Sequence, residues 1–157
     1  MTPDVLIIMG SKSDLPVGEK VIKALKELGI SYELKVASAH RTPKLVAELV
    51  DKSEVKVFIA IAGLSAALPG AIAAHTIRPV IGVPVSGKVN LDSVLSIVQM
   101  PSGIPVAAVG LDMGENAAIL AAQIIAIGKP EIEKKLLEHR SEQERKVHAD
   151  SSSLGDM

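Results

Sequence analysis

The stretch Val5–Asp14 reads VLIIMGSKSD and joins a short apolar run to a loop of glycine, serine and charged residues. An uninterrupted apolar run of this length is typical of a strand that is buried on both faces of a sheet. Ser13 and Asp14 are residue types that cap helices, and Pro16 is tolerated within a first helical turn. The stretch therefore predicts a strand, a short loop and a helix, which is the repeating unit of a parallel α/β sheet.

The rest of the chain repeats this alternation of β-branched runs and helical patterns. We expect strands at 5–9, 32–36, 57–61, 80–83 and 106–109, and helices at about 14–28, 42–50, 66–75, 91–98 and 115–127. The fold class is α/β: a three-layer αβα, flavodoxin-like doubly wound parallel sheet of about five strands. We expect a single domain over 1–157, with a core at about 4–128, a charged amphipathic C-terminal helix at about 130–148 and a frayed tail to 157.

The composition argues against several classes of protein. Lys and Arg number 17 against 18 Asp and Glu, so no surplus of positive charge indicates a nucleic acid or an anionic membrane as partner. The chain has one Phe, one Tyr and no Cys, which excludes base-stacking platforms, disulfides and a cysteine nucleophile. No two histidines have the i, i+4 spacing of metal ligands, so we expect no metal.

The residues 57–74 form an uncharged run that has the length of a membrane span. Gly63, Pro69 and Gly70 interrupt the run, so a buried strand followed by a turn and a buried helix explains it better. The N-terminal residues lack the pattern of a secretory signal, and we expect a cytoplasmic location without a membrane.

In a doubly wound sheet, ligands bind outside the carboxyl ends of the strands, near the point where the strand order reverses. The first such loop holds Ser11, Ser13 and Asp14, whose hydroxyls, amides and carboxylate suit a phosphate and the hydroxyls of a ribose. Alternatively, Ser13 or Asp14 only caps the following helix. The chain lacks the G-x-G-x-x-G and P-loop patterns, which argues against a dinucleotide enzyme or a nucleoside triphosphatase.

The second loop carries Ser38 and the pair His40-Arg41. An imidazole gains or loses a proton near neutral pH, and a guanidinium offers several donors to a phosphate. The alternatives are a turn histidine and a solvated surface charge. The third loop, Ala62–Gly70, is small and apolar; it either packs a helix tightly on the sheet or forms a dry wall beside a planar ring, with backbone amides as its donors.

Several motifs occur in one order along the chain. They are the Gly10–Asp14 loop, Ser38–Pro43 (SAHRTP), Pro79–Val85 (PVIGVPV), Leu91–Ser93 (LDS) and Ser96–Pro101 (SIVQMP). Together they resemble the N5-carboxyaminoimidazole ribonucleotide mutase family, the catalytic subunit associated with phosphoribosylaminoimidazole carboxylation. The resemblance extends from about Val5 to Ile127.

The resemblance implies an enzyme of purine biosynthesis that moves a carboxylate from the exocyclic nitrogen of an imidazole ribonucleotide to ring carbon four. His40 would be the general acid and base. Substrate binding would fall to Ser11, Asp14 and Arg41, to Ser13 and Ser38 at the phosphate, and to Ala62, Gly63 and Leu68 in the wall that holds CO2. No cofactor is implied. The implied partners are the ribonucleotide, CO2, copies of the chain in a homo-octamer with exchanged helices, and an upstream ATP-dependent carboxyaminoimidazole synthetase.

One position departs from the family pattern. Bacterial mutases usually carry a histidine in the segment aligned with Ala67, whereas the segment here resembles archaeal members. The enzymatic alternative is direct carboxylation of aminoimidazole ribonucleotide by CO2, a branch that typically has lysine after the catalytic histidine; Arg41 favours the mutase. The alternative from another class is a flavodoxin-like nucleotide-binding or receiver module, but a receiver needs an acceptor aspartate where this chain has Ala60–Gly63.

Overall fold

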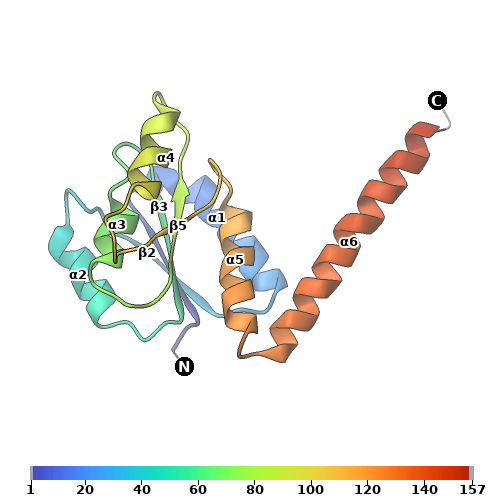
Figure 1. Cartoon of the computed structure of the whole chain (residues 1–157), viewed down its shortest axis with the longest axis horizontal. Coiled ribbons are helices and arrows are strands. Elements are labelled where there is room, and N and C mark those ends of the chain that lie inside the picture. Colours follow the sequence, from blue (N-terminus) through green and yellow to red (C-terminus); the bar gives the residue numbers. More distant parts are fainter. Residues whose placement is uncertain (1, 156–157) are drawn as a thin grey trace.

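A computed structural model describes residues 2–155. Its centre is a parallel sheet of strands in the order β2-β1-β3-β4-β5 (Figure 1), the flavodoxin order expected from the sequence. The strands are β1 (Val5–Met9), β2 (Tyr32–Val36), β3 (Val57–Ala62), β4 (Val80–Pro84) and β5 (Ala107–Ala108). Every residue of β1, β3 and β4 is buried, as their apolar runs predicted.

Helices cover both faces of this sheet and make the three layers that were expected. They are α1 (Leu15–Glu27), α2 (Pro43–Asp51), α3 (Leu68–Ala73), α4 (Asn90–Val98), α5 (Gly114–Ala126) and α6 (Pro130–Gly155), with a short 3₁₀ turn at Lys12–Asp14. Alternate residues of a strand point to opposite faces. Accordingly Ile7 packs in one core with α1 and α5, and Ile8 packs in a second core with α2, α3 and α4.

The register brings the carboxyl ends of three strands together. Met9 of β1 lies opposite Val36 of β2 on one side and Ile61 of β3 on the other. Backbone hydrogen bonds extend the pairing by one step, because Gly10 N donates to the Ile61 carbonyl oxygen at 3.0 Å and Ala37 N to that of Met9 at 2.9 Å. The loops that follow these strands therefore start from one edge of the sheet.

The uncharged run at residues 57–74 divides into β3 and α3, so the predicted buried strand and helix are confirmed. Among residues 2–155, no helix combines the length and the apolar character that a bilayer crossing requires. Strand β5 is shorter than the expected 106–109, because only Ala107 and Ala108 pair with β4.

Helix α6 extends away from the rest of the molecule (Figure 1). Ile132 is its one buried residue among those described. The expectation that this helix ends near residue 148 and leaves a frayed tail is wrong for residues 149–155, which continue the helix; residues 156–157 lie outside the described part. In the last turns, Ser152 Oγ donates to the His148 carbonyl oxygen at 2.9 Å, and Ser153 Oγ to that of Asp150 at 2.7 Å.

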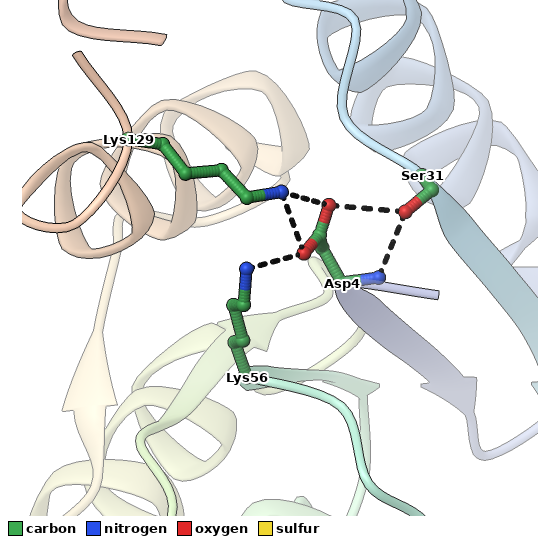
Figure 2. Close-up of polar contacts among 4 residues, drawn as sticks. All are labelled: Asp4, Ser31, Lys56 and Lys129. Carbon is green, nitrogen blue, oxygen red and sulfur yellow. Dashed lines mark hydrogen bonds and ion pairs between the residues drawn. The ribbon is translucent and has the colours of Figure 1, made fainter. Parts of the chain in front are cut away.

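A partly buried carboxylate, that of Asp4, fastens the base of α6 to the amino edge of the sheet (Figure 2). Lys129 Nζ lies 3.0 Å from both carboxylate oxygens of Asp4, and Lys56 Nζ lies 2.8 Å from one of them. Ser31 Oγ donates to the same group at 3.0 Å. Burial raises the pKa of Asp4, but the hydrogen bonds from both lysines and Ser31 together outweigh it and leave the pKa below its usual value.

Candidate active site

A cavity of about 410 Å³ opens at the carboxyl ends of β1, β2 and β3. Three loops line it: the one after β1, the one after β2, and the segment between β3 and α3. The lining includes every residue that the sequence singled out: Ser11, Ser13, Asp14, Ser38, His40, Arg41, Ala62, Gly63 and Leu68. The structure thus brings all of them together at one site, while their catalytic and binding roles remain predictions.

The loop after β1 is held by reciprocal hydrogen bonds between its ends. Ser11 Oγ accepts from Ser13 N at 3.3 Å and from Ser13 Oγ at 3.0 Å, and Asp14 Oδ2 accepts from Ser11 N at 3.0 Å. This is a capping box, with Ser11 as the cap of the 3₁₀ turn. Asp14 also occupies the N-cap position of α1, as the alternative predicted, but its side chain makes no cap hydrogen bond to α1 and instead accepts from Ser11 N.

Asp14 is the charged residue with the least exposure at this site, with 8% of its surface accessible. Burial raises the pKa of its carboxyl group above the usual value, and the Ser11 amide and the nearby Arg41 charge oppose this only in part. A carboxylate held in this way has lost part of its hydration before any ligand arrives. It is suited to accept hydrogen bonds from the hydroxyls of a sugar.

Arg41 connects the first two loops. Its Nη2 donates to the Gly10 carbonyl oxygen at 2.8 Å, and its Nε and backbone N donate to Ser38 Oγ at 3.3 and 3.2 Å. Although exposed, the guanidinium is therefore held in place, which a freely solvated surface charge would not be. A guanidinium has five N–H donors, and those that are not used here can reach an anion in the cavity.

The turn that presents His40 is closed by Thr42. Thr42 Oγ1 accepts from Ser38 N at 2.9 Å and donates to the Ser38 carbonyl oxygen at 3.2 Å, and Thr42 N donates to the same oxygen at 2.9 Å. His40 is exposed at the tip of this turn, and its ring makes no hydrogen bond with another residue of 2–155. Both ring nitrogens are thus open to a ligand. Sequence reasoning missed Thr42 as the residue that shapes this turn, although it lies within the quoted motif.

The third wall is mostly apolar. Ala62 and Leu68 are 4% and 2% exposed, and Val85 from the loop after β4 lies behind Gly63. Leu64 and Ser65, which belong to the predicted Ala62–Gly70 wall but were not singled out as ligand contacts, also line the cavity, and Ser65 adds a hydroxyl where only backbone donors were expected. Ala67, where a histidine is usual in bacterial mutases, is not among the lining residues. Within residues 2–155, no group of three His, Asp or Glu side chains could hold a metal ion.

The sequence of this chain matches that of a known protein family. A family model described as AIR carboxylase matches residues 4–146. The chain belongs to the AIR carboxylase family. This confirms the resemblance that was drawn from the motifs, and the match covers all three loops of the cavity.

Relatives of this AIR carboxylase family member span nearly its full length. It is 55% identical over 154 residues to the N5-carboxyaminoimidazole ribonucleotide mutase of Methanocaldococcus jannaschii, which covers 98% of each chain. The protein of that name from Pyrococcus horikoshii is 50% identical, over 99% of this chain and 90% of the relative. A probable mutase from Methanobrevibacter smithii is 57% identical, but this chain spans only 44% of its length.

Solved structures of the AIR carboxylase family have the same fold. Treponema denticola PurE superposes with a TM-score of 0.87 at 33% identity, over 96% of this chain and 97% of that one. A Treponema denticola PurE2 variant gives a TM-score of 0.89 at 33% identity, over 98% and 99% of the two chains. Nearly the whole chain therefore has counterparts in proteins of the family.

Proposed function

We propose that this chain is an N5-carboxyaminoimidazole ribonucleotide mutase of purine biosynthesis, which converts that substrate to 4-carboxyaminoimidazole ribonucleotide. One observation carries the proposal: His40, which can exchange protons, lines the same cavity as a serine-rich loop, an arginine and an apolar wall. The relatives that bear this name are similar to the chain over these loops.

The polar side of the cavity suits the ribose phosphate. Arg41 offers guanidinium donors, and the hydroxyls of Ser11, Ser13 and Ser38 lie on the same side. Donors that other residues already orient lose little freedom when a phosphate binds, so each hydrogen bond contributes more to affinity. Asp14 then accepts from the ribose hydroxyls and fixes the orientation of the base.

His40 acts first as an acid and then as a base. Its imidazolium donates a proton to the carbamate nitrogen of the substrate while the bond from that nitrogen to the carboxyl carbon breaks. This step yields the neutral amine of aminoimidazole ribonucleotide and CO2. Ring carbon four then attacks CO2 and forms the new carbon–carbon bond, and neutral His40 removes the proton from that carbon. The ring regains aromaticity, and His40 regains the proton that it gave.

The apolar wall keeps the released CO2 within reach of the ring. Ala62, Gly63 and Leu68 offer no charged group that would draw water toward CO2. Recapture of a molecule that has not left the cavity is effectively intramolecular, and this raises the probability of the second step over escape.

The proposal is tested by supplying the purified protein with either carboxyl source. One reaction contains N5-carboxyaminoimidazole ribonucleotide, and the other contains aminoimidazole ribonucleotide with bicarbonate; the carboxylated product is followed by its absorbance. We expect fast turnover of the first substrate without added bicarbonate. Turnover with bicarbonate alone would instead establish direct carboxylation, the reaction in the name of the matched family model, and no turnover with either would refute the assignment.

The role of His40 is tested by His40→Asn, which keeps a polar side chain but cannot exchange protons. We expect kcat to fall by about 10²- to 10⁴-fold, the usual contribution of general acid–base catalysis. The dissociation constant of the nucleotide should stay within about threefold. The control is His75→Asn, at an exposed histidine that does not line the cavity. An equal loss of binding and turnover would show that His40 only positions the ligand.

We also propose that the chain works in the cytoplasm as a homo-octamer, and that an ATP-dependent carboxyaminoimidazole synthetase supplies its substrate. Support for assembly comes from α6, where Leu137, Val147 and Leu154 are 64%, 67% and 66% exposed in a single copy. Large apolar side chains that are exposed on a helix favour contact with another protein surface. The mass in solution, measured by light scattering, tests the octamer.

A further inference from the structure

The cavity has two sides of unlike chemistry, and one residue does not fit its side. The loops after β1 and β2 supply the charged and hydroxyl groups, and the segment between β3 and α3 supplies the apolar wall. On that wall Ser65 has the only polar side chain, beside Ala62, Gly63, Leu64 and Leu68. The Ser65 hydroxyl on this wall can therefore contact the part of a ligand that faces away from the polar loops.

The serine hydroxyls on the polar side each take part in a hydrogen bond within the protein, although Ser11 Oγ and Ser38 Oγ only accept and keep their protons for a ligand. Ser13 Oγ donates to Ser11 Oγ at 3.0 Å, and Ser38 Oγ accepts twice from Arg41. The Ser65 hydroxyl, by contrast, makes no hydrogen bond with another residue of 2–155, and Ser65 is exposed at the cavity surface. Its proton is thus free for a ligand. Its neighbours on the wall are apolar, so no other side chain of the wall competes with it for a polar group of the ligand.

The chemistry of the proposed substrate indicates which ligand group reaches this hydroxyl. With the phosphate and ribose on the polar loops, the imidazole lies toward the β3–α3 wall. The one anionic group of that end of the nucleotide is the carboxylate that the reaction transfers. We propose that Ser65 Oγ donates a hydrogen bond to this carboxylate, and that Ser65 is a specificity-determining residue which distinguishes carboxylated from decarboxylated nucleotide. This inference rests on the proposed function.

The inference has a quantitative consequence. A hydrogen bond to a charged acceptor strengthens binding by roughly ten- to a hundredfold. Aminoimidazole ribonucleotide lacks the carboxylate and cannot use this bond. Removal of the hydroxyl should therefore weaken the binding of 4-carboxyaminoimidazole ribonucleotide by about tenfold or more. The affinity for aminoimidazole ribonucleotide should stay within about twofold.

The test measures both dissociation constants by titration calorimetry for the full-length protein and three variants. Ser65→Ala removes the hydroxyl, and Ser65→Thr restores it on a side chain with one more methyl group. The matched control is Ser53→Ala, since the Ser53 hydroxyl accepts only a 3.5 Å bond from Val55 N and does not line this cavity. Circular dichroism verifies that each variant is folded.

We expect Ser65→Ala to lose affinity for the carboxylated nucleotide alone, and Ser65→Thr and Ser53→Ala to bind both nucleotides as the parent does. Equal weakening of both nucleotides by Ser65→Ala, or no weakening of either, would overturn the role of Ser65. Because these are binding measurements, they stand apart from turnover. A parent protein that is inactive in the two-substrate assay would refute the proposed function, and the difference between the two nucleotides would still decide on Ser65.

Discussion

Gly114 is the point of closest approach between the two helices on one face of the sheet, and its substitution makes a sharp prediction. It is the first residue of α5, and a Cβ atom there would lie 2.5 Å from the carbonyl oxygen of Val17 and 3.0 Å from Cγ2 of Val21. A carbon and a carbonyl oxygen normally approach no closer than about 3.3 Å. The first clash involves the backbone of α1, so a change of rotamer cannot relieve it.

Gly114→Ala must therefore move α5 from α1 by nearly 1 Å. The alanines of α5 that pack in this core, Ala117, Ala118, Ala121 and Ala122, are fully buried and too small to fill the gap. A gap of about 0.5–1 Å loses a quarter to a half of each dispersion contact across the interface. Overpacking of a core usually costs about 1–3 kcal/mol, and the better helix propensity of alanine returns less than about 1 kcal/mol. We expect a net loss of about 2 kcal/mol.

Urea unfolding followed by circular dichroism measures this loss. With a slope of about 2 kcal/mol per molar urea, the midpoint should fall by about 1 M at an unchanged slope. All samples need the same protein concentration, since assembly would shift the midpoint. The control is Gly128→Ala, because a Cβ there has no neighbour within 4 Å and the midpoint should stay the same or rise slightly. A Gly114→Ala protein as stable as the parent would refute the steric argument.

The two shifted carboxyl groups make opposite predictions. Asp14 has a raised pKa, so its ionisation opposes folding increasingly as the pH rises through that pKa. Asp14→Asn can still accept a hydrogen bond from the Ser11 amide, so it should stabilise the fold at pH 7 while it raises KM. Urea unfolding measures the stability and steady-state kinetics measure KM. A urea midpoint below that of the parent would contradict the reasoning. Asp4 has a lowered pKa, so its contribution is complete above about pH 3.9 and disappears as the pH falls through its folded pKa. At pH 7, Asp4→Asn should lower the free energy of unfolding by on the order of 1 kcal/mol, and in acid its stability should match that of the parent. Urea unfolding from pH 3 to 7 measures this. A difference in stability that stays constant over that range would contradict the role of the charge.

Much of the fold follows from local signals in the sequence. The bounds of β1 and β2 agree with prediction because each is a compact run of strand-forming residues between turn signals. Helix α6 extends beyond its predicted end. The prediction relied on the apolar pattern, which stops near Val147, whereas the backbone hydrogen bonds that continue a helix do not require apolar side chains. Serine side chains that bond back to preceding carbonyls satisfy their own polar groups in those last turns.

The site was predictable where residue types have specific chemistry. His40 and Arg41 stood out because they follow a strand in a doubly wound sheet, and the structure places both at the cavity. The details depended on geometry that no pattern records. Ser11, Ser13 and Asp14 are all suitable caps, and only the backbone path after β1 makes Ser11 the cap. Ser65 was predicted only as part of the Ala62–Gly70 wall, because a serine within a small apolar segment looks the same whether it faces a core or a cavity.

The contact between Asp4 and Lys129 also has a mechanical consequence. Helix α6 has 26 residues, and at 1.5 Å per residue it is about 39 Å long. It behaves as a lever whose pivot lies at its first turn, so a rotation of about 10° at the pivot displaces the far end by about 7 Å. A small shift of the lysine and the carboxylate that lie 3.0 Å apart at the amino edge of the sheet, or of the buried Ile132 beside them, would thus be amplified at the opposite end of the helix.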